Sequence, residues 1–86
     1  MYYGIIKYSF DSEKPVLGPY ATEEEAWAGI EKSADEEYRI AKDVNEWECE
    51  IHKDKDCGEI VLTEYFDDRN DVTEFFIIEI NNTKLI

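Results

Sequence analysis

The sequence predicts a single α+β domain, residues 1–86, in which one helix packs on one face of a four-stranded mixed sheet. A segment with helical spacing of apolar residues begins at a strong capping sequence near residue 22. The segments on both sides alternate or are rich in aromatic and β-branched residues, as strands are. A chain of 86 residues, 43% of them hydrophobic, suffices for one small core. The expected element order is β-α-β-β-β.

The first strand is expected over residues 2–10, where aromatic and β-branched residues dominate. Residues 11–20 are expected to be a loop. Asp11-Ser12, Pro15 and Gly18-Pro19 are all typical of turns, and Pro also removes a backbone donor from a strand.

The helix is expected from about residue 23 to about residue 43. Thr22 and Glu25 form a capping box, in which each side chain accepts a hydrogen bond from the other residue's backbone N–H. The three acids that follow Thr22 suit the positive end of the helix dipole. One face of this helix is apolar: Ala26, Trp27, Ile30, Ala34, Tyr38 and Ala41.

Three further strands are expected over residues 47–53, 59–66 and 72–80, separated by polar turns. The segment Phe75–Ile78 is apolar on both faces, which is typical of a central strand, whereas residues 46–53 carry the charges of an edge strand. We therefore predict the strand order 2-3-4-1, with the first strand beside and parallel to the fourth.

No catalytic or cofactor site is expected, and the chain is interpreted as a non-enzymatic protein. Cys49 and His52 are three residues apart on a strand, so their side chains point to opposite faces and cannot form a nucleophile–base pair. The acids in the two turns lack the spacing of a calcium loop, so no metal site is predicted. Cys49 and Cys57 are expected to be reduced, because the hairpin register does not place them opposite each other.

The charge excludes whole classes of partner. The chain has 22 acidic and 9 basic residues, a net charge of −13. A field of this sign repels nucleic acids and anionic membranes and attracts basic protein surfaces. No signal peptide is evident, and the apolar runs are too short to cross a bilayer, so the expected location is the cytoplasm.

Strand alternation predicts that one sheet face is left uncovered by a single helix. On the predicted alternation, Tyr65, Phe75, Ile77 and Ile5 lie together on that face. A contiguous apolar patch of this kind usually marks an interface. Alternatively, the segment 11–20 folds over the face with Val16, Leu17 and Tyr20.

The acids of the second half of the chain are expected to form a rim around the sheet and to bind a basic protein partner, with Tyr65 and Phe75 as apolar anchors. Carboxylates at every second strand residue lie about 7 Å apart, close to the phosphate spacing of one nucleic acid strand. In the alternative, the open face is a homodimer interface and the acids serve solubility. The predicted rim residues are Glu46, Glu48, Glu50, Asp67, Asp68, Asp71 and Glu74.

Residues 21–27 (ATEEEAW), 34–38 (ADEEY) and 76–80 (FIIEI) resemble segments of small acidic proteins that phages and mobile elements encode. In overall character the chain is also similar to anti-restriction and anti-CRISPR inhibitors, several of which mimic DNA. This resemblance implies an inhibitor that occupies the nucleic-acid-binding groove of another protein. It assigns no role to an individual residue.

Overall fold

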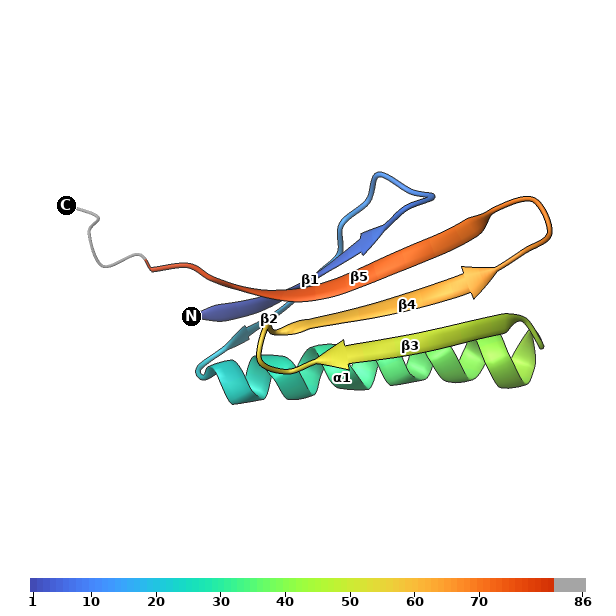
Figure 1. Cartoon of the computed structure of the whole chain (residues 1–86). Helices are drawn as coiled ribbons and strands as arrows, with labels where there is room; N and C mark the ends of the chain where they lie inside the picture. Colours follow the sequence, from blue (N-terminus) through green and yellow to red (C-terminus); the bar gives the residue numbers. More distant parts are fainter. Residues whose placement is uncertain (82–86) are drawn as a thin grey trace.

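The computed structural model describes residues 1–81, which form one helix packed on one face of an antiparallel five-stranded sheet (Figure 1). The α+β class and the single helix are as predicted, whereas the prediction of four strands is wrong. In chain order the elements are β1 (Tyr2–Tyr8), β2 (Val16–Tyr20), α1 (Glu23–Arg39), the π-helical turn η1 (Ile40–Val44), β3 (Glu48–Asp54), β4 (Glu59–Tyr65) and β5 (Asn70–Glu79).

The strand order in the sheet is β2-β1-β5-β4-β3. The predicted neighbours are therefore correct, with β3 at one edge and β5 central, between β4 and β1. The predicted direction is wrong, because β1 runs antiparallel to β5. The additional strand β2 reverses the chain before the helix. As a result, α1 connects two edge strands that run in the same direction, and every neighbouring pair in the sheet is antiparallel.

The strand β2 lies within the segment that the sequence predicts to be a loop. It pairs with β1 through Gly4 opposite Leu17 and Ile5 opposite Val16. Gly18 has φ +111°, a conformation that side-chain-bearing residues rarely adopt, and Pro19 follows it. Both residues are tolerated because β2 is an edge strand. Proline has no backbone N–H to donate, and on the outer side of an edge strand there is no neighbouring strand to accept that hydrogen bond.

The helix begins as the sequence predicts. The Thr22 hydroxyl accepts a hydrogen bond from the Glu25 backbone N–H at 3.1 Å, and the Glu25 carboxylate accepts one from the Thr22 N–H at 3.2 Å. Ala26, Trp27, Ile30 and Ala34 are buried along α1, and Ala41 continues this apolar face in η1. The predicted helix end near residue 43 therefore agrees with the combined extent of α1 and η1.

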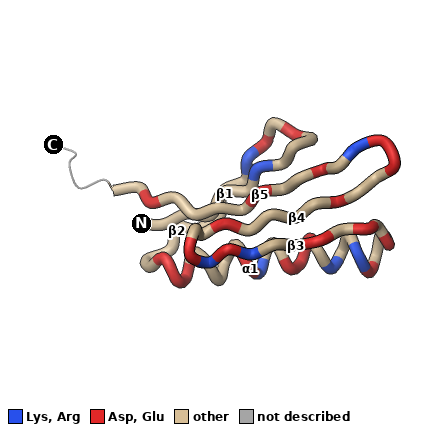
Figure 2. The backbone as a smooth tube through the Cα atoms, in the orientation of Figure 1, with Lys and Arg blue, Asp and Glu red and all other residues tan. Residues whose placement is uncertain are grey.

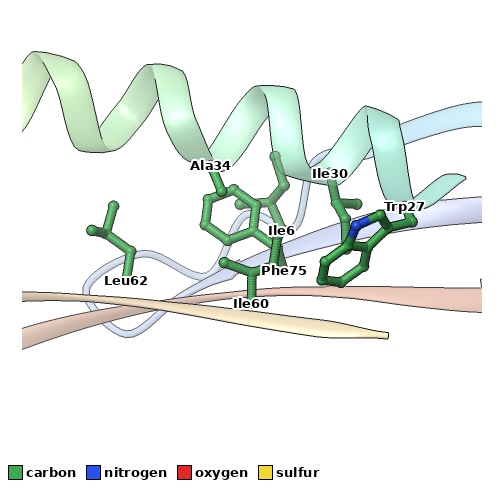
Figure 3. Packing of buried hydrophobic residues seen from close by; sticks show 7 residues of the cluster. All are labelled: Ile6, Trp27, Ile30, Ala34, Ile60, Leu62 and Phe75. Carbon is green, nitrogen blue, oxygen red and sulfur yellow. The ribbon is translucent and has the colours of Figure 1, made fainter. Parts of the chain in front are cut away.

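The core lies between α1 and the sheet (Figure 3). Ile30 and Ala34 from the helix meet Ile60, Leu62 and Phe75 from the sheet, and all five side chains are almost inaccessible to solvent. The central position of Phe75 corrects the predicted alternation of β5: Phe75 and Ile77 lie on the helix side, and Phe76 and Ile78 lie on the other side. No helix among residues 1–81 is long and apolar enough to cross a membrane.

Candidate functional site: the open sheet face

The face of the sheet opposite α1, here called the open face, is defined by the register of the five strands. Its apolar and neutral side chains occupy the middle and one end, and its carboxylates come mainly from β3 and β4. The strand residues on this face are Tyr3, Ile5, Lys7, Val16, Glu48, Glu50, His52, Asp54, Glu59, Val61, Thr63, Tyr65, Val72, Glu74, Phe76 and Ile78.

An apolar centre runs across the open face from β2 to β5. Ile5 lies opposite Val16 on one side and opposite Phe76 on the other, and Tyr3 lies opposite Ile78. Val16 remains 58% exposed at the edge. Because side chains directly opposite each other on antiparallel strands are in contact, these residues form one continuous apolar patch.

Two side chains of the segment 9–20 turn toward the helix side of the sheet. Leu17 packs against the core on the helix side, and Phe10 borders a cavity that is also lined by Glu37 of the helix. Val16 of the same segment lies on the open face, where it extends the patch from edge strand β2. The expected cover by Val16, Leu17 and Tyr20 is therefore wrong for Leu17, and the apolar centre remains partly exposed.

Five carboxylates share the open face with this apolar centre. Figure 2 shows acidic residues along β3, β4 and β5, and the register assigns five of them to this face: Glu48, Glu50, Asp54, Glu59 and Glu74. Among residues 1–81, Lys7 is the single lysine or arginine whose strand position places it on this face, beside Glu74. The open face is therefore strongly negative.

Basic residues elsewhere neutralise acids that are not on this face. Lys53 lies on the helix side of β3 and pairs with Glu31 at 3.0 Å and Asp35 at 2.9 Å. Arg39 pairs with Glu36 on the exposed side of the helix. These two cations are engaged by acids of the helix and do not offset the carboxylates of the open face.

The predicted rim residues occupy different positions. Glu48 and Glu50 are exposed on the open face of edge strand β3, and Glu74 lies on the central strand β5. Asp67 and Asp68 are exposed in the turn between β4 and β5. Glu46 precedes β3 with φ +56°.

One predicted rim residue does not belong to the open face. Asp71 is on the helix side of the sheet, its side chain is only 14% exposed, and it forms an ion pair with Arg69 at 3.1 Å.

Of the two predicted aromatic anchors, Tyr65 is on the open face and Phe75 is not. The Tyr65 hydroxyl donates a hydrogen bond to the Glu50 carboxylate, and this bond, together with burial and the charges of Glu50 and Glu48, raises the pKa of Tyr65. Phe75 is 0% exposed in the core, so it cannot contact a partner. Phe76 takes its place on the open face, opposite Ile5 and Glu59.

The remaining reactive side chains do not form a catalytic group. Cys49 lies on the helix side and His52 on the open face, as strand alternation predicts, and both cysteines are free. The described residues contain no cluster of three or more acidic, histidine or cysteine side chains arranged to hold a metal ion. Comparisons with protein-family models, curated proteins and solved structures find no match for this chain.

Proposed function

We propose that this chain is a non-enzymatic binding protein whose open face docks on a basic surface of another protein. The proposal rests on one observation: the open face combines an apolar centre with five carboxylates and a single basic strand residue. Apolar contact supplies affinity at the centre of an interface, and complementary charge supplies orientation and a fast association rate.

The spacing of the acids favours a partner surface that normally holds nucleic acid. Glu48 and Glu50 are alternate residues of an exposed edge strand. Carboxylates in this relationship are about 7 Å apart, which is close to the spacing of phosphates along one strand. Lysine and arginine side chains placed to contact successive phosphates could contact this row instead. An inhibitor that mimics DNA is the specific form of the function that we propose.

The alternative function, a homodimer through the open face, is supported by the uncovered apolar centre alone. Two copies packed face to face would bring two sets of five carboxylates together, with one lysine from each copy to offset them. Like charges brought into a desolvated interface cost free energy. Charge complementarity therefore favours a basic partner over a second copy, and we expect light scattering to show a monomer.

The proposal can be tested by capture from two fractions of one lysate of the source organism. Proteins retained on a DNA column form the first fraction and the flow-through forms the second. The immobilised chain is expected to retain specific proteins from the first fraction at low salt and to release them at high salt, because screening shortens the range of charge attraction. Equal capture from both fractions would contradict the proposal.

A charge-neutral variant separates the apolar contribution from the electrostatic one. Phe76→Ser with Ile78→Ser removes apolar surface from the open face and leaves the net charge unchanged. We expect weaker capture with the same salt dependence. A matched pair on the helix side, Ala28→Ser with Val44→Ser, changes exposed residues of α1 and η1 and should capture as the unmodified chain does.

A further inference from the structure

A second feature lies on the other side of the sheet, where the C-terminal end of the helical segment meets β4 and β5. Here the described residues line a cavity of about 230 Å³ that is open to solvent. Two of its walls are aromatic: Phe10, which is 59% exposed, and Trp47, which is 41% exposed. Exposed aromatic side chains that face a shared cavity favour a ligand able to stack between or against them.

The cavity is also lined by two carboxylates, Glu37 from α1 and Glu64 from β4. Neither takes part in an ion pair among residues 1–81, although the Tyr8 hydroxyl lies 3.5 Å from Glu37 as a hydrogen-bond donor. Burial raises the pKa of both groups. The charge of Glu64 also raises the pKa of Glu37, and that of Asp71 raises the pKa of Glu64. Partly desolvated anions without a cation are costly, and a bound cation would stabilise them.

Thr73 also lines the cavity and is 2% exposed. The end of the helical segment is a further group suited to a positively charged donor. Ile40, Ala41 and Asn45 place the end of the helical segment at the cavity. The C-terminal end of a helix carries partial negative charge. The helix end and two carboxylates without an ion pair among the described residues therefore converge on one space.

We propose that this cavity binds a guanidinium group. The guanidinium is planar, weakly hydrated and always charged, so it stacks on an indole ring and donates to two carboxylates at once. The described residues hold no group of three or more acidic, histidine or cysteine side chains that could bind a metal ion, whereas two carboxylates beside an indole suit a planar organic cation. Because the cavity and the open face are on opposite sides of the sheet, this site does not depend on the proposed function.

Nuclear magnetic resonance titration of the full chain with Nα-acetyl-arginine amide tests the site. The neutral isostere Nα-acetyl-citrulline amide controls for shape, and Nα-acetyl-lysine amide controls for charge. At about 150 mM salt, which screens non-specific attraction to the acidic surface, we expect saturable shifts from the arginine derivative at Ala41, Asn45 and the Trp47 indole. The citrulline derivative should give none, and the lysine derivative should bind more weakly.

Substitution of the carboxylates completes the test. Glu37→Gln with Glu64→Gln should weaken binding of the arginine derivative on the order of tenfold or more, since each bond from a charged donor to a carboxylate is lost. Glu24→Gln with Asp43→Asn makes the same change in net charge at exposed positions and should leave binding within about twofold. Both variants remove charge without removing volume, and their amide spectra report whether the fold is retained.

Three results would overturn the proposal: shifts that do not saturate or that spread over the whole acidic surface, equal binding by the citrulline or lysine derivative, and undiminished binding by the Glu37→Gln, Glu64→Gln variant. The single substitution Glu37→Gln provides the same comparison if the double variant does not fold.

Discussion

Phe75 and Phe76 are adjacent in the chain and lie on opposite faces of β5. Phe75 is fully buried against α1 and pairs with Ile60, whereas Phe76 pairs with Glu59 on the open face. Two residues joined by one peptide bond therefore belong to the core and to the candidate binding face, respectively. This relationship makes the two residues a direct test of the sheet register.

Phe75→Ala should lower the free energy of unfolding by about 3–5 kcal/mol, because it leaves a cavity in the core. Phe76→Ala should cost about 1 kcal/mol, since its side chain is partly solvated in the free protein. Urea unfolding followed by circular dichroism measures both values. Phe75→Leu and Phe76→Leu provide a milder pair should the first variant not fold. Equal losses would show that the faces of β5 are assigned incorrectly.

Gly4 lies beneath Ile30, and a methyl group at position 4 would overlap the Ile30 side chain. We expect Gly4→Ala to destabilise the protein by about 1–3 kcal/mol through overpacking, although alanine is otherwise the better strand residue. Truncation of the neighbour should relieve the overlap. In a double-mutant cycle, Gly4→Ala with Ile30→Ala is therefore expected to lose less stability than the sum of the two single losses. Additive losses would contradict a direct contact.

Thr22→Ala should lower stability by about 1 kcal/mol, because the substitution leaves the Glu25 backbone N–H without its capping acceptor. Thr22→Ser keeps the hydroxyl and should retain most of the stability. Thermal unfolding of the three proteins under one condition makes this comparison. A Thr22→Ala variant as stable as the unmodified chain would show that the capping box contributes nothing.

The helix could be predicted from the sequence because its signals are local. Thr22, Glu25 and the helical spacing of Trp27, Ile30 and Ala34 depend on residues within a few turns of one another. The faces of β5 could not be predicted in the same way, because Phe75, Phe76, Ile77 and Ile78 are apolar on both sides. The buried side depends on how β5 pairs with β4 and with β1, and β1 is far from β5 along the chain.

The strand β2 escaped prediction for a related reason. The residues Val16, Leu17 and Tyr20 are suited to a strand, but Gly18-Pro19 interrupts them, and this dipeptide more commonly marks a turn. It is accommodated at a sheet edge that the sequence does not reveal. The direction of β1 relative to β5 follows from β2, so that prediction failed together with it. Strand alternation placed Glu48, Glu50 and Tyr65 on the correct face of the sheet, whereas it assigned Phe76 to the wrong face.

Stability should fall as the pH rises above about 4.5, because burial raises the pKa values of Glu37 and Glu64 above that ordinary value. In the pH interval between the ordinary and the raised pKa, the folded state binds more protons than the unfolded state. The slope of unfolding free energy against pH is then negative. Repulsion within the acidic surface acts in the same direction.

Thermal unfolding at several pH values measures this slope. The Glu37→Gln, Glu64→Gln variant should show a shallower dependence than the unmodified chain, because the two groups with raised pKa no longer titrate. Glu24→Gln with Asp43→Asn changes the net charge equally and should leave the slope closer to that of the unmodified chain. Identical slopes in the two variants would show that net charge alone causes the pH dependence of stability.

Docking of the open face on a basic protein surface is tested by the affinity of a captured partner for two variants of equal charge. Glu48→Gln with Glu50→Gln neutralises the edge of the open face, and Glu24→Gln with Asp43→Asn neutralises exposed acids on the helical segment. Calorimetry at two salt concentrations gives the dissociation constants. We expect the first variant to bind on the order of tenfold more weakly and with a reduced salt dependence, and the second to bind as the unmodified chain does. Equal loss of affinity in both variants would show that the open face is not the docking surface.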